Sequence, residues 1–391
     1  MGRFTCGAYV RKRQRDITLT PERERTVNRK TLCRAALPSL VALTLGMTAC
    51  GASNEDSGGD SGGSSSLSGT INGAGATSQE AAMAGWQSGF QTANPDTTVN
   101  YDAIGSGGGR EQFLAGGATA FAGSDDALEG KEISQAEDRC GGAYIEIPVY
   151  ISPIAVIYNL PGVDDLNLAP DTIAGIFAGD ITKWNDPAIV KDNPSADLPD
   201  SDITPVHRSD ESGTTGNFTA YLDAVSSSVW TYGSVETWPI KGGEGGDGTS
   251  GVVAAVQNGE GTIGYADASQ AGELGKANVG VGSSWQAPTP EAAAAVVDAS
   301  TAVTGRPDGD LAIELARDST KSGTYPIVLI SYHIACTKYD DSNEAALVKA
   351  FENYVISEQG QQDAAKAAGS APMSDTLRQK AQSAVDMIQT S

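Results

Sequence analysis

The segment Pro205-Val-His-Arg-Ser-Asp-Glu-Ser-Gly-Thr-Thr-Gly-Asn-Phe-Thr-Ala220 joins a short apolar run to a predicted helix. Apolar side chains then recur at helical spacing, and Ser212 and Thr214 stand where such a helix usually begins. The first turn of a helix has unpaired backbone N–H groups and the positive end of the helix dipole. Arg208 adds a planar fork of donors. These donors predict a binding site for a small tetrahedral oxyanion. The alternative is an ordinary capped helix beside a surface arginine.

A second polar loop, Gly73-Ala-Gly-Ala-Thr77-Ser78, lies near the start of the predicted globular body. A short strand is predicted to end at Thr70-Ile71, and a helix with large apolar residues on one face follows the loop. The glycines favour a tight turn, and the two hydroxyls lie at the helix N-terminus. The loop does not match a dinucleotide-binding fingerprint, because Ser78 stands at the third glycine position.

Two further predicted strands end in polar residues. The strand Val99–Ile104 leads into Gly105-Ser-Gly-Gly-Gly109, which carries the hydroxyl of Ser106 and precedes a predicted helix at Arg110–Ala115. The strand Ala120–Asp125 ends in a carboxylate. The glycine loop is not a phosphate loop of the Walker type, because no Gly-Lys-Ser/Thr follows. Successive strand ends of this kind predict an open α/β sheet with ligands at the carboxyl ends of its strands.

The charge of the chain excludes some partners. Its 391 residues suit two domains, and the formal net charge is −23. The first 49 residues contain 10 Lys or Arg and 3 Asp or Glu, so the remainder has 16 basic and 46 acidic side chains, a net charge of −30. Nucleic acid is not an expected partner, because binding it requires a basic face. An anion would be attracted only by the short-range field of its pocket.

The N-terminal residues predict export and lipid attachment. A basic region precedes the short apolar run Ala35–Ala49, which is too short to span a bilayer and is typical of a signal peptide. Met47-Thr-Ala-Cys50 resembles the lipobox of bacterial lipoproteins, so residues 1–49 are expected to be removed and Cys50 to carry the lipid. Plain secretion is the alternative. Residues 50–66 are Gly-, Ser- and Asp-rich and predict a flexible tether.

Together these loops resemble the ligand loops of the PstS family, the phosphate-binding components of phosphate-specific ABC transporters. The segments that carry the resemblance are Gly73–Thr77, Ile104–Ser106, Gly123–Asp125, Asp171–Asp186, Arg208–Thr214, Trp238–Ile240 and Gly261–Tyr265. The similarity covers essentially all of residues 67–391. It implies a lipid-anchored monomer at the outer face of the cytoplasmic membrane that binds inorganic phosphate and delivers it to permease and ATPase subunits. The implied phosphate-binding residues are Ala76, Thr77, Ser78, Ser106, Asp125, Arg208, Ser212, Gly213 and Thr214.

The resemblance also implies the architecture. This is an α/β clamshell of the periplasmic-binding-protein type (type II, Venus-flytrap), whose two lobes are joined by a double crossover hinge. Lobe I is expected to comprise residues 67–149 and 327–391, and lobe II residues 150–326. The apolar run Pro148–Asn159 predicts the crossing strand, and the chain returns near Tyr325-Pro326. Further helices are predicted at Pro170–Ala178, Pro290–Val297, Glu344–Ile356 and Ser374–Ile388.

Asp125 is expected to set the choice of anion. Donor groups alone accept any tetrahedral oxyanion, whereas a carboxylate repels an anion that offers it no proton. Phosphate carries a proton at neutral pH and sulfate carries none. The family often has an aromatic residue where this chain has Ser78, so ring packing against the ligand is not expected here.

Two cysteines of the predicted body are expected to pair. Cys140 and Cys336 each lie beside a predicted crossing strand, and paired thiols are usual in an extracytoplasmic protein. Two buried free thiols are the alternative.

Other functions are less well supported by the residues. A surface phosphatase would need a nucleophile and base or a metal set, yet the chain has two histidines, His207 and His333, and no Gly-x-Ser-x-Gly elbow or zinc-ligand spacing. His207 is expected to face away from the ligand, since neighbours on a strand point to opposite faces. No catalytic residue, metal or cofactor is therefore expected. A receptor for sulfate, molybdate or another tetrahedral anion and an adhesin without a ligand remain alternatives.

Overall fold

The computed structural model describes residues 67–390, so the predicted signal peptide, Cys50 and the tether lie outside the described residues. The longer strands are β1 (Gly69–Gly75), β2 (Thr97–Ala103), β3 (Thr119–Ser124), β4 (Tyr144–Asn159), β6 (Thr204–Arg208), β8 (Thr262–Asp267), β10 (Asn278–Val281) and β14 (Val328–Cys336). The short ones are β5 (Asn167–Leu168), β7 (Glu244–Gly246), β9 (Gly275–Lys276), β11 (Ser284–Gln286), β12 (Thr301–Ala302) and β13 (Ile313–Glu314).

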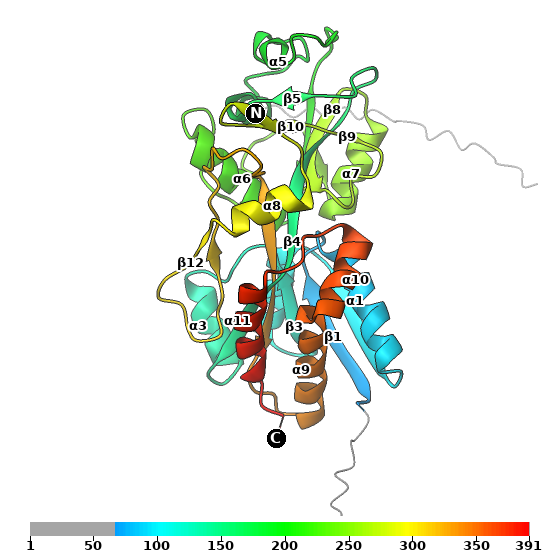
Figure 1. Cartoon of the computed structure of the whole chain (residues 1–391), viewed down its shortest axis with the longest axis vertical. Helices are drawn as coiled ribbons and strands as arrows, with labels where there is room; N and C mark the ends of the chain where they lie inside the picture. The colour runs from blue at the N-terminus through cyan, green and yellow to red at the C-terminus, as the bar shows by residue number, and fades with distance from the viewer. Residues whose placement is uncertain (1–66, 391) are drawn as a thin grey trace, which may run out of the picture. The chain divides into compact units, whose positions relative to one another are not determined.

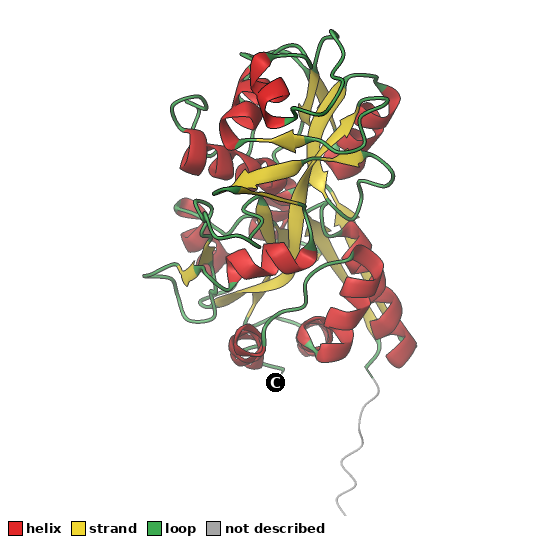
Figure 2. Ribbon diagram, turned by 45° about the horizontal axis from the view of Figure 1, so that its top comes forward, coloured by secondary structure: helices red, strands yellow, loops and turns green. Residues whose placement is uncertain are grey.

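Helices cover the strands on the outside of the molecule (Figure 2). Those of the first part of the chain are α1 (Glu80–Ala93), α2 (Ser106–Ala115), α3 (Lys131–Arg139), α4 (Pro170–Ala178), α5 (Pro187–Asp192) and α6 (Gly213–Ser226). Those of the second part are α7 (Gly248–Asn258), α8 (Pro290–Val297), α9 (Ser342–Ile356), α10 (Glu358–Ala368) and α11 (Asp375–Asp386). Within residues 67–390 no helix has the length and apolar character needed to cross a membrane.

One continuous sheet runs through both halves of the molecule, with strand order β2-β1-β3-β14-β4-β8-β6-β7 and β9 paired to β4. β1 pairs in parallel with β2 and β3, whereas β14 runs antiparallel to both β3 and β4. β4 is the long central element in Figure 1, and every residue from Tyr144 to Tyr158 is buried. Its near-continuous apolar sequence is what a strand covered on both faces requires.

The two-lobe fold is confirmed, and β4 contributes to the sheet of both lobes. Its residues 144–153 pair with β14, and its residues 154–159 pair with β8. Figure 1 shows α1, α9, α10 and α11 around the β1 end of the sheet, and α6 and α7 around the β8 end. The exact lobe boundaries stay a prediction; Arg306, which the prediction puts in lobe II, contacts Leu128 and Glu146 of lobe I.

Several predicted elements differ in extent from the observed ones. β1 continues to Gly75 instead of ending at Thr70-Ile71, because its parallel pairing with β2 extends that far. Gly73 serves this packing rather than a turn, since a Cβ there would collide with the ring of Phe121. α2 begins at Ser106, so three predicted loop glycines are helical. α10 was not predicted, although Ser357 caps its start by accepting from the Gly360 N–H.

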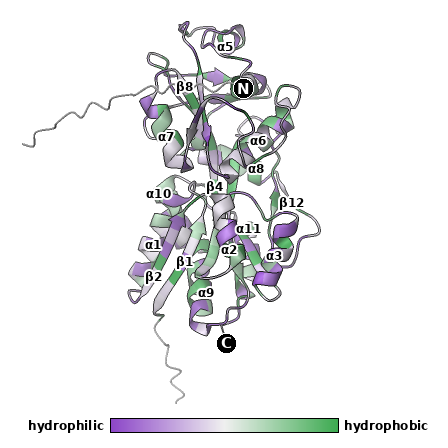
Figure 3. Ribbon diagram, turned by 180° about the vertical axis from the view of Figure 1, so that it is seen from behind, coloured by the Kyte–Doolittle hydropathy of each residue, from purple (hydrophilic) through white to green (hydrophobic). Residues whose placement is uncertain are grey.

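The disulfide prediction is confirmed by a Cys140–Cys336 bond with a Cα–Cα distance of 5.1 Å. It ties the end of β14 to the segment after α3, and both sulfur-bearing side chains lie in an apolar cluster with Phe113 and Tyr144. β14 is buried along its whole length, whereas α3 is largely hydrophilic in Figure 3. The bond therefore anchors a surface helix to the core of lobe I.

Candidate functional site

Three predicted site residues contact a fourth, Asp125. Ser78 follows β1, Ser106 begins α2, Asp125 follows β3, and Thr214 lies in the first turn of α6 in lobe II. The Ser78 hydroxyl donates to Asp125 Oδ1 at 2.6 Å, and the Thr214 hydroxyl donates to Oδ2 at 2.8 Å. The backbone N–H of Asp125 donates to Ser106 Oγ at 3.1 Å. All four residues are buried, so the structure brings groups from both lobes to one interior place.

The start of α6 has the predicted cap. Ser212 Oγ accepts a hydrogen bond from the Thr215 N–H at 3.2 Å, which is the usual contact of an N-cap serine. Gly213 allows the helix to approach lobe I closely. A Cβ at this position would lie 2.7 Å from Ser106 Oγ and 2.8 Å from the Asp125 Cβ, so a larger residue would push the two lobes apart.

Arg208 stands at the end of β6 with 2% of its surface exposed. Its Nε donates to Asp210 Oδ1 at 2.7 Å, and its Nη2 pairs with the other carboxylate oxygen. Asp210 also accepts from the Gly248 N–H at 3.2 Å. Gly105 of lobe I lies against this pair with a φ of 90°, and a Cβ there would be 2.6 Å from Asp210 Oδ2. The guanidinium fork is therefore held in a fixed direction beside a lobe I loop.

Asp210 is a residue that the sequence analysis did not single out. Its position could have indicated a partner for Arg208, since Asp210 lies two residues after Arg208 in the segment Pro205–Ala220. A buried guanidinium requires an ionic or hydrogen-bonding partner, and an acidic residue at that spacing was a candidate.

Thr77 and Ala76 use their polar groups differently. Thr249, at the start of α7 in lobe II, donates its N–H to Thr77 Oγ1 at 3.0 Å, and the two threonine hydroxyl oxygens lie 2.9 Å apart. Gln270 of lobe II donates to the Thr77 carbonyl oxygen at 2.7 Å. The N–H of Ala76 donates to the Gly123 carbonyl at 2.9 Å, inside lobe I. Thr77 thus faces lobe II, while the Ala76 N–H continues the pairing of β1 with β3.

Sequence reasoning missed Thr249, Gln270 and a third contact residue, Asn217. The Asn217 Nδ2 donates to the Asp125 carbonyl oxygen at 2.6 Å from the second turn of α6. Thr249 and Gln270 are 172 and 193 residues from Thr77. No local pattern relates positions so far apart. His207, by contrast, stacks on Trp238 with ring centroids 5.0 Å apart, and its ring nitrogens lie near the carbonyl oxygens of Arg208 and Gly242.

Burial dominates the electrostatics of Asp125. Loss of water raises the pKa of its carboxyl, and hydrogen bonds from Ser78, Ser331 and Thr214 and the charge of Arg208 act in the opposite direction. The net shift of the pKa is upward. A carboxylate in this position is a strong acceptor for any proton that a ligand offers.

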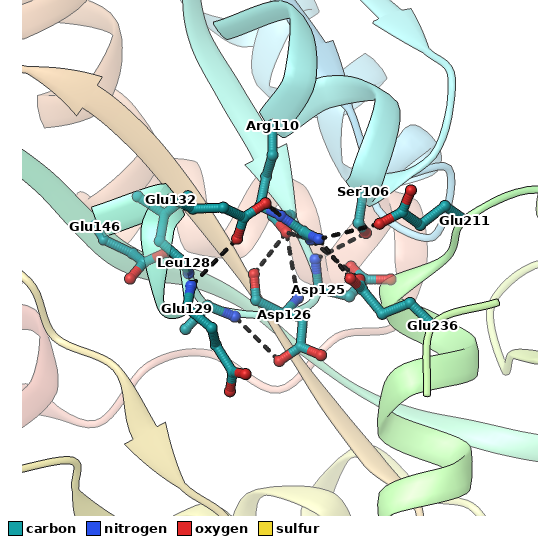
Figure 4. Close-up of polar contacts among 12 residues, drawn as sticks. Ser106, Arg110, Asp125, Asp126, Leu128, Glu129, Glu132, Glu146, Glu211 and Glu236 are labelled. Atoms are coloured by element: carbon teal, nitrogen blue, oxygen red, sulfur yellow. Dashed lines mark hydrogen bonds and ion pairs between the residues drawn. The ribbon is translucent and has the colours of Figure 1, made fainter. Parts of the chain in front are cut away.

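A cavity of about 1090 Å³ is lined by residues of both lobes, and Asp125 is one of them. Its lining contains nine Asp or Glu side chains and two arginines, Arg110 and Arg317. Figure 4 shows Arg110 between Glu132 on one side and Glu211 and Glu236 on the other. Its Nε donates to Glu132 at 3.0 Å, and its Nη1 donates to Glu236 of lobe II at 3.0 Å. Because the cavity lining is acidic, attraction of an anion would depend on the donors near Asp125 and on Arg208.

The chain is similar to proteins of one known family. A family model described as a PBP superfamily domain matches residues 60–359. Phosphate-binding protein PstS 3 of Mycobacterium leprae is 38% identical over 324 residues, which are 81% of this chain and 86% of that protein. Phosphate-binding protein PstS 3 of Mycobacterium tuberculosis (strain H37Rv) is 37% identical over 369 residues, 90% and 98% of the two chains. The chain belongs to the PstS family.

Solved structures agree on the fold. A high-affinity periplasmic phosphate-binding protein, PfluDING, bound with phosphate, has a TM-score of 0.67 at 23% identity and covers 80% of this chain and 93% of its own. The phosphate-binding protein from Stenotrophomonas maltophilia has a TM-score of 0.62 at 19% identity, covering 81% and 94%. In this PstS-family chain, three of the segments that carry the resemblance, Ile104–Ser106, Gly123–Asp125 and Arg208–Thr214, meet at Asp125.

Proposed function

We propose that the chain binds inorganic phosphate between its two lobes and delivers it to the permease of an ABC transporter. The observation that carries this proposal is the buried Asp125 carboxylate, which lies among hydroxyl donors of both lobes. The relatives in the PstS family are named phosphate-binding proteins, which supports the same ligand.

Donors of two kinds would hold the anion. Arg208 would supply charge and a bidentate fork, oriented by Asp210. The hydroxyls of Ser106 and Ser212 and the N–H groups at the start of α6, including that of Gly213, would complete the shell. The hydroxyls of Ser78 and Thr214, which donate to Asp125 in this structure, would join it with that of Thr77 by turning toward the anion. Ser106 and Ser212 already accept from backbone N–H groups, so their own hydroxyl protons are free to point toward a ligand.

The carboxylate would make the site selective for a protonated anion. Phosphate at neutral pH can donate its remaining proton to Asp125, whereas sulfate would place bare oxygens against a buried carboxylate. Sites that demand such a hydrogen bond discriminate by about 10⁴–10⁵.

Closure of the lobes would accompany binding. The residues that would bind the anion come from loops on either side of the two crossings between the lobes. The hinge is proposed near Pro148–Ser152 and Tyr325–Ile327. The Thr77–Thr249 and Asp125–Thr214 contacts between the lobes support a closed form of this kind. A ligand that fixes the closed form would raise the melting temperature, since it binds the native state only.

The cellular setting follows from the N-terminal sequence and from the family. Lipidation at Cys50 would hold a monomeric receptor at the outer face of the cytoplasmic membrane, where the permease and its ATPase act. A Cys50→Ala variant is expected to carry no lipid and to be released to the medium or left uncleaved. Membrane retention of that variant after removal of its signal would contradict the anchor.

Calorimetry on the chain from residue 51 onward tests the ligand. Phosphate is expected to bind at least about a thousandfold more tightly than sulfate at pH 7.5. This is the lower limit that we set for a site that requires a hydrogen bond from its ligand. Equal affinities, or tighter binding of sulfate or molybdate, would overturn the choice of phosphate. Release of a chromophore from a chromogenic phosphate ester would favour the phosphatase alternative.

A further inference from the structure

A buried asparagine of α6 joins the two lobes beside the candidate site. Asn217 has 4% of its surface exposed. Its Nδ2 donates to the Asp125 carbonyl oxygen of lobe I at 2.6 Å and to the Gly213 carbonyl oxygen of lobe II at 2.8 Å. Asp125 carries the candidate selective carboxylate, and Gly213 is the first residue of α6, where the proposed N–H donors lie. One amide group therefore connects residues on both sides of the site.

The face of α6 that carries Asn217 lies close against lobe I. Gly213, Gly216 and Asn217 are at positions i, i+3 and i+4, which share one face of a helix. A Cβ at Gly213 would lie 2.9 Å from the Asp126 backbone nitrogen, and a Cβ at Gly216 would lie 2.7 Å from Asp126 Oδ2. The two glycines thus permit the approach that brings the Asn217 amide to the Asp125 carbonyl.

Arg317 binds the other end of the same amide. Its Nη2 donates to Asn217 Oδ1, and its Nη1 donates to the Val328 carbonyl oxygen at 3.0 Å. Val328 is the first residue of β14 and directly follows the proposed return crossing Tyr325–Ile327. The guanidinium therefore connects the amide to lobe I next to the hinge. The function proposed above uses neither Arg317 nor the side chain of Asn217.

Donor and acceptor chemistry permits one orientation of the Asn217 amide. A guanidinium only donates hydrogen bonds, and a carbonyl oxygen only accepts them. Oδ1 must therefore face Arg317, and Nδ2 must face the two carbonyls; the reversed amide would oppose donors to donors and acceptors to acceptors. Burial lowers the pKa of Arg317 to about 10, so the guanidinium keeps its charge at neutral pH. Both ends of the amide are thus matched to their partners in the closed form.

We propose that Asn217 and Arg317 are positioning residues that favour the closed form of the protein and so strengthen anion binding without contacting the anion. The inference rests on the proposed phosphate site and hinge. Separation of the lobes would break the bond between Asn217 and the Asp125 carbonyl, so this bond lowers the free energy of the closed form relative to the open one. A contribution to closure is the same for every anion that the closed form holds, so it changes affinity and leaves selectivity unchanged.

Calorimetry on the chain from residue 51 onward, at pH 7.5, tests the effect on affinity. The two ligands are inorganic phosphate and arsenate, since arsenate is a tetrahedral anion that also keeps a proton. Asn217→Ala is expected to lower both affinities by the same factor, about 3–10-fold, the usual effect of losing one hydrogen bond. An unchanged phosphate affinity, or unequal losses for the two anions, would overturn the proposal.

An isosteric variant tests the donor end of the amide. Asn217→Asp keeps the size of the side chain and still accepts from Arg317, but it has no N–H for the Asp125 carbonyl. Its phosphate affinity is expected to fall at least as far as that of Asn217→Ala. Wild-type affinity in Asn217→Asp would show that the donor has no role, and would overturn the proposal.

A double variant tests whether Arg317 acts through Asn217. Arg317→Met is expected to lower phosphate affinity about 2–5-fold, and to add less than a factor of two in the Asn217→Ala background. Arg139→Met is the matched control, because Arg139 is also a half-buried arginine but lies over the Phe113 ring in lobe I. Wild-type affinity is expected there. A full loss from Arg317→Met in the Asn217→Ala background would mean that the charge of Arg317 acts by itself, and would overturn its assignment.

The kinetics of phosphate binding distinguish closure from damage to the site. A bond that forms only after the lobes close slows release, so Asn217→Ala is expected to raise the dissociation rate about 3–10-fold and to leave the association rate unchanged. Slower association with unchanged dissociation would overturn the proposal. If Asn217→Ala does not fold, the same measurement on Asn217→Asp decides. Failure of the wild type to bind phosphate would instead reject the proposed function itself.

Discussion

The Thr214 hydroxyl donates to the Asp125 carboxylate at 2.8 Å and so joins the two lobes. Thr214 opens a helix of lobe II, and Asp125 follows a strand of lobe I, 89 residues earlier in the chain. The carboxylate that would select the ligand is therefore in contact with the lobe that would close over it. Under the proposed function, ligand selectivity and lobe closure would depend on the same interface.

Replacement of Asp125 tests the source of selectivity. Asp125→Asn keeps the size of the side chain, removes its charge and adds N–H donors. Phosphate affinity is expected to fall tenfold or more, since a charged hydrogen bond is worth about 1.5–3 kcal/mol, while sulfate binding becomes measurable by calorimetry. Asp126→Asn is the control, because Asp126 is the adjacent carboxylate and its Oδ1 accepts from the Ala127 N–H at 3.1 Å. Firm exclusion of sulfate by Asp125→Asn would place the selectivity elsewhere.

Replacement of Arg208 tests the contribution of its positive charge to anion binding. Arg208→Ala is expected to lower phosphate affinity by about 2–5 kcal/mol, because the anion and Asp210 would both lose their buried cation. Arg208→Lys should recover only part of this loss, since the bidentate geometry is absent. The matched change is Arg378→Ala, which removes a surface ion pair with Asp375. An affinity for Arg208→Ala within a factor of three of wild type would contradict the assignment.

The Arg110–Glu236 ion pair is expected to favour closure. Glu236→Gln removes a bond between the lobes, so the ligand-free protein should be more open in solution scattering. Phosphate affinity should fall about 3–30-fold, because binding must then supply more of the closing free energy. Glu132→Gln is the control, since Glu132 contacts the same arginine from within lobe I. Equal scattering and affinity for the two variants would contradict a role in closure.

Asp267 predicts a pH dependence of stability. Burial, aided by the charge of Asp125, raises the pKa of Asp267 from 3.8 to about 6. Between pH 4 and pH 6, roughly, the folded protein therefore binds more protons at this group than the unfolded chain does. The contribution of Asp267 to the free energy of unfolding falls as the pH rises through that range. Asp267→Asn should flatten the dependence of the denaturant midpoint across that window. Asp180→Asn, at an exposed position, should leave it unchanged; an unchanged profile in Asp267→Asn would contradict the shift.

The sequence by itself determined the local parts of this protein. Helix α6 was predicted from Ser212 and the apolar spacing that follows, because a cap and a 3.6-residue period are encoded within one segment. The part of the buried strand β4 from Pro148 to Asn159 was predicted from its largely apolar run, and the placement of Asp125 from the strand that precedes it. These features need no knowledge of what lies opposite.

Contacts between distant segments were decided only by the tertiary structure. Thr249 and Gln270 meet Thr77, and Glu236 meets Arg110, at separations of more than one hundred residues. Such pairs depend on strand order and on how closely the lobes approach. Their residue types, hydroxyls and charges, are common on any surface and carry no periodic signal. The sequence therefore specified the loops that form the candidate site, and the fold specified which side chains stand behind and across from them.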